Sequence, residues 1–548
     1  MRTTLRALSV SCLLIAAGCV GSLSIDNVAA SGGTGGATGN GGTTGNGGTT
    51  GAGAAGGGSG GATTGAAGMG GATGVAGTTG RGGTTGGAGT VGAGGTTGAA
   101  GRAGAGGTTG GAGTTGRGGT TGGAGATGAA GSVAAGGAGG CTITAASTFS
   151  TSIGNVAIVT FSTDASGVTA AEIQFGPSSG GTTMTAPVDL TQTSYRTVLV
   201  GMKPSTAYVY RVVVTSSAGA CTSQDYAITT GALANAPKPT VSIMNASAHD
   251  KGFIVTSSGL SGTAAYIIDP DGTVVWSAPS GVPSTPSRAH LSWDATKMYV
   301  MSLNVQNTSS GKIVIQPLDG SASSSLSGVQ ASHHDLTAIP GGLATPLWNS
   351  SGTDAPCSLV EFTESGAKTT VIADMKTVYN SSTFHTNSVH YYPSDDTYTL
   401  GDRNPNLYVK VTRTGTLIWQ FGGSNPKDQT KFFSGVTTWQ VNHGHQLTSD
   451  GMFLFFNNNA NEAWEYKLDE SSMSATQTTH YTASGATSNV LGDVQRLPNG
   501  NLLVTFSTGG QIHEVSPTGT LVMKITAPSN QQFGYSEFRE SLYGPPPY

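Results

Sequence analysis

The chain has 548 residues, 89 of them glycine, and only 9% of its residues are charged. Its formal net charge of -4 and the lack of a basic cluster argue against a nucleic-acid partner, which needs a concentrated positive surface. In chain order, residues 1–19 come first. Arg2 and Arg6 precede the apolar run LSVSCLLIAAG, a pattern typical of a secretory signal and too short to span a membrane.

The signal ends in AAGC, which resembles the lipobox of bacterial lipoproteins. This resemblance implies that Cys19 becomes the lipidated first residue of the mature chain. The alternative is cleavage by an ordinary signal peptidase. We therefore expect an exported protein, anchored in a membrane through the lipid on Cys19 and facing the periplasm or the cell surface.

Residues 20–140 form a low-complexity segment of Gly, Thr and Ala in units such as GGTTGGAGTTGRGGTTGGAG. Such a composition cannot bury a hydrophobic core, so we expect a disordered linker. Its end-to-end distance would be on the order of 60 Å. The segment has no strict Gly-X-Y period with proline, which excludes collagen.

Residues 141–235 change to short alternating runs, including NVAIVTFST, AAEIQFG and YVYRVVVTS. Alternating runs between Gly, Ser and Pro turns predict a β-sandwich. The string MKPSTAYVYRVVV resembles the fibronectin type III consensus, and Tyr208 falls at that family's corner tyrosine. Cys141 opens this unit, and Cys221 follows the strand that begins with YVYRVVV, so we predict a disulfide between them. Cys357 is then left as an inert buried thiol.

Residues 240–548 contain six copies of a strand, a Gly-containing turn and a second strand, such as AAYIIDPDGTVVWSA and LYVKVTRTGTLIWQF. Further hairpins lie between these copies, among them LTAIPGGLATPLW and VQRLPNGNLLVTF. Two hairpins per repeat make a four-stranded blade. The sequence therefore predicts an all-β chain: a disordered linker, a fibronectin type III-like β-sandwich and a six-bladed β-propeller.

Histidines recur at one position of the inner hairpins. His443 precedes the turn residue Gly451 by eight residues, and His334 precedes Gly342 by the same number. His385 enters another such hairpin. If these loops converge at one mouth of the axial channel, the three imidazoles share a centre.

Arg403 follows the next strand and would offer hydrogen-bond donors to an oxyanion beside these imidazoles. The rival interpretation is a zinc or copper site, which three or four histidines would suit. A buried arginine opposes a bound cation. We therefore expect no metal and no other cofactor.

Roughly residues 250–540 resemble the bacterial aryl-sulfate sulfotransferases, which move a sulfuryl group between phenols without a nucleotide sulfate donor. The shared motifs include HHDLTAIPGG, HTNSVHYYPSDDTYTLGDRN, GTLIWQFGG and NHGHQLTSDG. The resemblance implies that His443 is the nucleophile, forming a sulfohistidine by ping-pong kinetics. It further implies that His385, Arg403 and His334 are catalytic partners. The substrates would be an aryl sulfate donor and a phenolic acceptor.

Four further residues are predicted to contact the substrate. His445 shares a face with His443 on a regular strand, Asn387 lies in the HTNS motif, Trp439 is an aromatic residue close before His443, and His333 neighbours His334. Where many family members have DNG after the nucleophile's strand, this chain has FFNNNANEAWEY. That departure predicts a different acceptor side or low activity.

Two other functions remain open at this point. In the first, the propeller would be a non-catalytic module that binds a glycan or a protein; in the second, it would be a metal-dependent enzyme. Stoichiometric zinc or copper would favour the second of these, and the altered FFNNN segment mildly favours the first.

Overall fold

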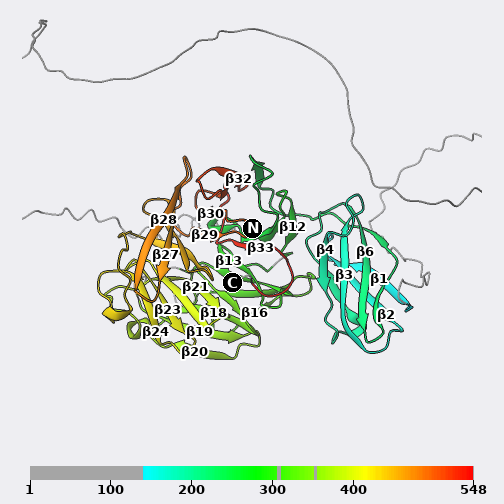
Figure 1. The fold of residues 1–548 in the computed structure, drawn as a ribbon, viewed down its shortest axis with the longest axis horizontal. Helices are drawn as coiled ribbons and strands as arrows, with labels where there is room; N and C mark the ends of the chain where they lie inside the picture. Colours follow the sequence, from blue (N-terminus) through cyan, green and yellow to red (C-terminus); the bar gives the residue numbers. More distant parts are fainter. Residues whose placement is uncertain (1–139, 280, 305–309, 351–354, 547–548) are drawn as a thin grey trace, which may run out of the picture. The chain divides into compact units, whose positions relative to one another are not determined.

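The computed structural model describes residues 140–279, 281–304, 310–350 and 355–546, which form an all-β structure (Figure 1). The helical residues within these ranges are four short 3-10 turns: Thr193–Tyr195, Gly259–Ser261, Met375–Thr377 and Gln429–Lys431. The predicted lipidation residue Cys19 and nearly all of the predicted linker lie outside the described residues. Within the described ranges, no helix is long and apolar enough to cross a membrane.

Two antiparallel sheets form the region predicted as a β-sandwich. The first contains β1 (Ile143–Phe149), β2 (Ala157–Thr163) and β5 (Thr197–Leu199). The second contains β4 (Met184–Pro187), β3 (Val168–Pro177), β6 (Ala207–Ser216) and β7 (Gly219–Thr222), with β8 (Tyr226–Thr229) paired to β6. Both sheets contribute buried side chains to one core, for example Phe161 from the first and Phe175 from the second. The alternating burial along β2 matches the alternation of its sequence.

Two details of this sandwich concern residues singled out in the sequence. The structure contains a disulfide between Cys141 and Cys221, the pair predicted above. The hydroxyl of Tyr208 accepts a hydrogen bond of 2.8 Å from the backbone N–H of Lys203, a contact expected of a corner tyrosine. The assignment to the fibronectin type III family itself stays a prediction.

Six further antiparallel sheets follow in chain order. From the inner strand outward, the first sheet contains β33 (Glu537–Arg539), β10 (Phe253–Ser257), β11 (Ala265–Ile268) and β12 (Val274–Ser277). The second contains β13 (Pro286–Leu291), β14 (Lys297–Ser302), β15 (Ile313–Pro317) and β16 (Ser324–Ser325). The third contains β17 (Thr337–Ile339), β18 (Gly342–Trp348), β19 (Cys357–Thr363) and β20 (Lys368–Ile372).

The fourth sheet contains β21 (Thr386–Tyr392), β22 (Thr397–Asp402), β23 (Leu407–Thr412) and β24 (Leu417–Gly422). The fifth contains β25 (Asn442–Leu447), β26 (Met452–Asn457), β27 (Glu462–Asp469) and β28 (Ser474–Thr482). The sixth contains β29 (Asp493–Arg496), β30 (Leu502–Phe506), β31 (Gln511–Val515), β32 (Leu521–Thr526) and β9 (Thr240–Ile243). We interpret each of the six sheets as one blade of a β-propeller.

The inner strands form a closed ring. β13 contacts β17, β17 contacts β21, β21 contacts β25, and β25 contacts β29. The C-terminal strand β33 closes the ring, because Phe538 N–H donates to Gln495 of β29 and Glu537 accepts from Leu291 N–H of β13. The N-terminal strand β9 pairs with the outer strand β32 of the last sheet. Both ends of the propeller chain therefore help to join its first and last sheets.

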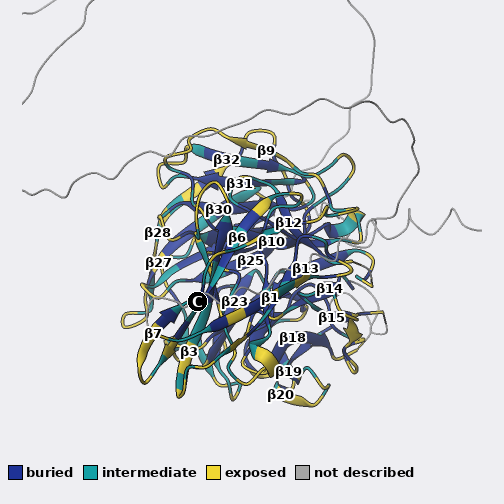
Figure 2. Cartoon of the chain, turned by 90° about the vertical axis from the view of Figure 1, so that its right-hand side faces the viewer, coloured by how far each residue is buried: buried dark blue, intermediate teal, exposed yellow. Residues whose placement is uncertain are grey.

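The propeller strands are buried more completely than those of the sandwich. Every residue of β21 and β22 is buried, although β21 has the sequence TNSVHYY. Figure 2 shows that buried residues concentrate in the strands, whereas exposed residues gather in the connecting turns. Polar side chains on inner strands therefore lie away from bulk water, where they need partners or a function.

Candidate active site

Three predicted catalytic histidines lie together where inner strands begin. His334 lies three residues before β17, His385 directly precedes β21, and His443 is the second residue of β25. The Nε2 atoms of His334 and His385 are 3.5 Å apart, and the ring centroids of His334 and His443 are 5.8 Å apart. All three side chains are buried, with His385 the most exposed at 4%. Three successive sheets thus supply one imidazole cluster.

The backbone around His385 is held by the end of the adjacent strand. Asp402, the last residue of β22, accepts a 2.7 Å hydrogen bond from His385 N–H. The Arg403 N–H donates to the His385 carbonyl at 3.2 Å. Burial raises the pKa of Asp402 to about 6, and hydrogen bonds from Tyr379 and backbone N–H groups oppose that rise. Asp402 therefore positions the backbone that carries both His385 and Arg403.

The turn that leads to His443 has an unusual backbone conformation. Val441 has a φ of 57°, in a region that a β-branched residue rarely adopts. Its N–H donates to Asn406 Oδ1 at 2.6 Å, and its carbonyl accepts from Asn458 N–H at 2.9 Å. Such a conformation persists where surrounding contacts impose it, and it occurs often at functional sites. These two asparagines hold the chain in that conformation two residues before His443.

His443 has one nitrogen bound and one without a partner. Its Nδ1 lies 2.6 Å from Asn458 Oδ1, whereas its Nε2 is buried and has no hydrogen-bond partner among the described residues. Burial lowers the pKa of His443 well below its ordinary value, and the nearby positive charge of Arg403 lowers it further. The imidazole is therefore neutral at pH 7, with a free nitrogen facing the cluster.

Arg403 supplies the positive charge of this site. It directly follows β22, and its Nε is buried without a hydrogen-bond partner in the described part of the chain. Its charge lowers the pKa of both His443 and His334. An unpaired guanidinium N–H in a buried site is suited to binding an anion.

His333 lies behind His334 and contacts its other nitrogen. The Nδ1 atoms of the two rings are 2.8 Å apart, and Nε2 of His333 lies 3.2 Å from the Sγ atom of Cys357. His333 also stacks on Trp348 with ring centroids 3.9 Å apart. Burial lowers the pKa of both histidines well below the ordinary value and raises that of the Cys357 thiol. His333 thus orients His334, and Cys357 is a buried protonated thiol.

Asn387 lies next to the cluster, and its amide links two inner strands. Its Nδ2 donates to the backbone carbonyl of Asn442 at 2.6 Å, and the backbone carbonyl of Asn387 accepts from the Tyr535 hydroxyl at 2.9 Å. The Oδ1 of Asn387 is buried and has no partner among the described residues. The second hydrogen on Nδ2 remains a candidate donor to a substrate.

The structure places His445 and Trp439 apart from the cluster. A bulge between Asn442 and His445 interrupts the strand, so His443 and His445 do not share a face. The ring nitrogens of His445 lie 2.9 Å from Ser388 Oγ and 2.7 Å from Thr399 Oγ1. Trp439 packs against Phe421 and donates to Asn442. The geometry supports a packing role for both side chains, rather than the substrate contact predicted above.

An apolar cluster adjoins His443. Its buried members are Val490, Leu491 and Tyr535, and partly buried leucines from two other loops pack against them: Leu260 and Leu303. The Tyr535 ring centroid lies 6.4 Å from that of His443. This surface could not be found from periodicity, because its residues come from loops of different sheets.

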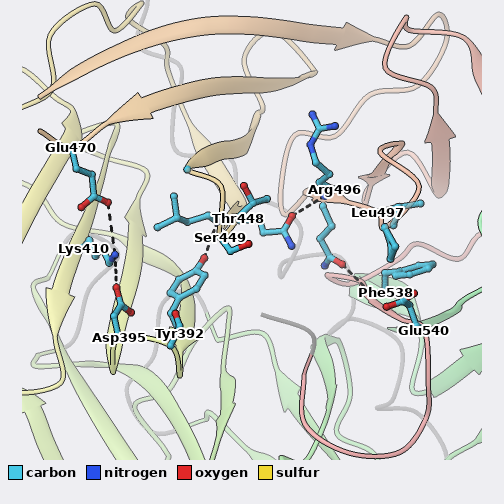
Figure 3. A pocket seen from close by; sticks show the side chains of 16 residues that line it. Tyr392, Asp395, Lys410, Thr448, Ser449, Glu470, Arg496, Leu497, Phe538 and Glu540 are labelled. Carbon is cyan, nitrogen blue, oxygen red and sulfur yellow. Dashed lines mark hydrogen bonds and ion pairs between the residues drawn. The ribbon is translucent and has the colours of Figure 1, made fainter. Parts of the chain in front are cut away.

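A separate cavity of about 360 Å³ lies at the opposite ends of the inner strands (Figure 3). Its walls include Tyr392, Leu447 and Arg496, the last residues of β21, β25 and β29. Lys410 there lies 2.7 Å from Asp395 and 3.8 Å from Glu470. None of the predicted catalytic side chains lines this cavity, so it is not the histidine site.

Residues 357–528 match the arylsulfotransferase (ASST) family. This match makes the second half of the propeller region similar to that family. The matched residues include His385, Arg403 and His443, whereas His334 precedes them. No curated protein sequence matches this chain.

Solved structures similar to the chain share little sequence with it. A putative 6-phosphogluconolactonase from Bacteroides fragilis has 13% identity and a TM-score of 0.36 over 53% of this chain and 98% of its own. A catalytically inactive virginiamycin B lyase from Staphylococcus aureus, solved with quinupristin, has 12% identity and a TM-score of 0.34 over 52% and 87%. TolB from Acinetobacter baumannii has 10% identity and a TM-score of 0.36 over 62% and 80%. None of these similarities bears on the chemistry of the arylsulfotransferase-like site.

Sequence reasoning missed Asn458, which lies in the FFNNN segment predicted to alter the acceptor side. The structure places its side chain against the nucleophile candidate instead. One signal could have identified it: Arg403 and Asn458 each directly follow the second strand of their sheets, β22 and β26. Comparing the repeats at that position would have marked Asn458 as a site residue.

Proposed function

We propose that this chain transfers a sulfuryl group from an aryl sulfate ester to a phenolic acceptor, with His443 as the nucleophile. The observation that carries this proposal is the buried, unpaired Nε2 of a neutral His443 beside two further imidazoles and Arg403. The match to the arylsulfotransferase family over the same strands supports it.

In the first half-reaction, the lone pair of His443 Nε2 attacks sulfur. The N–S bond forms as the bond between sulfur and the aryl oxygen breaks, and that oxygen leaves with the electron pair. The product is a sulfohistidine with its ring charged. In the second half-reaction, an acceptor phenol gives its proton to a neighbouring imidazole as its oxygen attacks sulfur, and the N–S electron pair returns to Nε2. Such a covalent intermediate gives ping-pong kinetics.

The neighbouring donors stabilise the charge on the transferring group. Sulfuryl transfer resembles phosphoryl transfer, whose loose transition state spreads charge over the terminal oxygens. The Arg403 guanidinium would face those oxygens, and N–H groups of His334 and His385 would turn toward them from their contact with each other. Each such donor is worth about 3 to 4 kcal/mol of transition-state stabilisation in comparable sites.

The departing phenolate needs a proton, since a phenol with a pKa of about 10 is only a moderate leaving group. His334 is held neutral by burial and by the charges of its neighbours. His385 is more exposed and faces His334 Nε2, so it is the better candidate for the general acid. A bound sulfate anion would favour the protonated form of an imidazole beside it.

The apolar cluster beside His443 provides a surface for the aryl group. Val490, Leu491 and the ring of Tyr535 form its buried part, and two leucines extend it toward solvent. An aromatic ring packed there would hold its ester oxygen near the imidazoles. This arrangement replaces Trp439 as the proposed aromatic contact.

A metal site is the second candidate, because ligand atoms of His333, His334 and His385 all lie within 4.8 Å of one another. However, the two nitrogens of His334 face different imidazoles, so one ion would have to displace an existing contact. The charge of Arg403 also opposes a cation at this place. The donor set fits an anion better than a metal ion.

Incubation of the purified full chain with 4-nitrophenyl sulfate, with and without phenol, tests the proposed function. We expect sustained nitrophenolate release only when phenol is present, in protein that contains no stoichiometric zinc or copper. Release that disappears on chelation and returns with zinc would instead establish the metal enzyme. No release with any of several donors would favour a binding propeller.

We further propose that a lipid on Cys19 anchors the chain to a membrane outside the cytoplasm, with residues 20–140 as the tether. The signal-like segment and its AAGC ending support this proposal. Cys19→Ser should move the protein from the membrane fraction to the soluble exported fraction. A wild-type chain already found in the soluble fraction would contradict the anchor.

A further inference from the structure

The side chain of Asn458 connects His443 to the neighbouring sheet. Asn458 directly follows β26 and is 4% exposed. Its Nδ2 donates to the backbone carbonyls of Ser488 at 2.8 Å and Leu491 at 2.6 Å, both in the loop before β29. Its Oδ1 lies 2.6 Å from His443 Nδ1. All the polar atoms of this amide are therefore used.

These contacts fix which way the amide faces. Two carbonyl oxygens can only accept, so the group that faces them has to be the NH₂. The oxygen of the amide is then directed at His443, and an oxygen can only accept. His443 must therefore carry its proton on Nδ1, which leaves the lone pair on Nε2, where no group of the described residues binds it.

Only asparagine suits this position among residues of its size. Leucine would leave Nδ1 of His443 and two carbonyls without partners. Aspartate would keep the acceptor for His443, but its second oxygen would face the Ser488 and Leu491 carbonyls, where a donor is required. The Asn458 backbone N–H also donates to Val441 in the strained turn before His443. Side chain and backbone thus act on the same imidazole.

We propose that Asn458 is a positioning residue for the sulfuryl transfer, which holds His443 in the tautomer with the proton on Nδ1. This inference rests on the proposed function of His443. In the attack, Nε2 uses its lone pair to form the N–S bond while Nδ1 keeps its proton, so the ring of the sulfohistidine is cationic. The amide oxygen of Asn458 accepts from that ring N–H throughout both half-reactions.

The other tautomer would stop the first step. With the proton on Nε2, the nitrogen that faces the cluster has no lone pair available for sulfur. Loss of the amide would also free the imidazole to rotate. The loss of rate should therefore appear in the formation of the sulfohistidine. Donor affinity should change little, because the side chain of Asn458 is fully used by His443 and two backbone carbonyls.

The first test compares Asn458→Ala with Asn459→Ala, its exposed neighbour. The measurement is the single-turnover burst of nitrophenolate from 4-nitrophenyl sulfate. We expect the burst rate constant of N458A to fall by roughly 10²- to 10⁴-fold, comparable to the loss of a general acid or base. Without phenol, its burst amplitude and the donor concentration that gives half of the maximal burst rate should stay within about threefold of wild type. N459A should match wild type in every value.

The burst separates positioning from a merely structural role. A structural role lowers the amplitude, because fewer molecules are folded, and leaves the rate constant of the folded fraction unchanged. That outcome in N458A would overturn the inference. A wild-type enzyme with no burst and no adduct would instead overturn the proposed function, so the two failures are distinguishable.

A second measurement needs no variant of Asn458. Nitrogen chemical shifts of ¹⁵N-histidine in the wild-type protein, assigned to His443 by difference from His443→Asn, report its tautomer directly. We expect a protonated Nδ1 and an unprotonated Nε2 at pH 7. A protonated Nε2 would overturn the inference, even if N458A cannot be folded.

Discussion

Two buried polar clusters lie among the inner strands, and they differ in how completely they are paired. Around Arg288, Asp335 lies 2.6 Å from Nε and Asp493 lies 3.2 Å from Nη1, while the ring of Tyr535 is 4.6 Å from the guanidinium. In the histidine cluster, His443 Nε2 and Arg403 Nε have no partner among the described residues. The first cluster satisfies its charges, and the second leaves strong polar groups open.

This difference separates a structural network from a reactive one. Unpaired buried polar groups cost stability, so each of them calls for an explanation. The Arg288 network joins strands β13, β17 and β29, and Arg288 also donates to the Ser536 carbonyl beside β33. It thereby helps to close the ring of sheets. The open groups at the histidine cluster instead match the position of a transferred sulfuryl group.

The largest effect should follow from removing the nucleophile. His443→Asn should reduce phenol-dependent turnover of 4-nitrophenyl sulfate by about 10⁴-fold or more, as loss of a covalent nucleophile does elsewhere. Its thermal unfolding midpoint should stay near that of wild type. Turnover within tenfold of wild type would mean that another group accepts the sulfuryl group.

Breaking the paired cluster should affect stability instead. Arg288→Met leaves Asp335 and Asp493 buried without their cation, which should lower the free energy of unfolding by about 3 to 5 kcal/mol. Burial already raises the pKa of Asp493 to about 7. Deprotonation above that pH places a charge in the site, so the loss should be larger at pH 8 than at pH 6.

Chemical denaturation at both pH values measures this effect. Per folded molecule, the burst rate constant of R288M should remain close to wild type, in contrast to that of N458A. Unchanged stability in R288M would show that the Arg288 network contributes nothing to ring closure.

Arg403→Gln tests the open cluster without removing the nucleophile. It deletes a positive charge beside the transferring group, so the burst rate constant should fall by about 10²- to 10³-fold. Stability should stay the same or rise, because the guanidinium Nε has no partner to lose within the described part of the chain. A rate within threefold of wild type would contradict the role of Arg403.

The same variant should also change the pH dependence. Burial and Arg403 hold the pKa of His443 well below 6.5 in the wild type, so His443 stays neutral as the pH falls from 8 to 6.5. Removing the positive charge raises that pKa. The burst rate should therefore begin to fall at a higher pH in R403Q than in wild type when the pH is lowered. A fall at the same pH in both proteins would show that Arg403 does not act on His443.

The smallest effect on activity should come from His445. Both of its ring nitrogens bind hydroxyl groups of the core, so His445→Gln should lower the free energy of unfolding by about 1 to 3 kcal/mol. Turnover per folded molecule should stay within about threefold of wild type. A selective increase in donor KM would restore the sequence-based prediction that His445 contacts the substrate.

The sequence predicted the local features of the propeller well, because they depend on short-range pattern. The outer hairpins, such as YVKVTRTGTLIW in β23 and β24, and the equal spacing of His443 and His334 from their turn glycines both follow from the repeats. To predict that the three histidines lie close together, it was enough to assume that equivalent loops of the repeats converge. The structure bears out that geometry.

Features that depend on distant partners could not be predicted this way. The bulge that turns His445 away from His443 depends on how β25 pairs with β26, and a regular two-residue period cannot reveal it. The closure by β33 and β9 joins strands about 280 residues apart. The role of Asn458 depends on carbonyls in the next sheet, which the FFNNN string alone does not indicate.

Intact-mass analysis of the wild-type chain and His443→Asn, after exposure to 4-nitrophenyl sulfate without acceptor, tests the central claim most directly. A sulfuryl adduct on the wild type alone, mapped to His443 and removed by adding phenol, is the predicted result. An adduct on another residue, or one that also forms on His443→Asn, would contradict the assignment of His443 as the nucleophile.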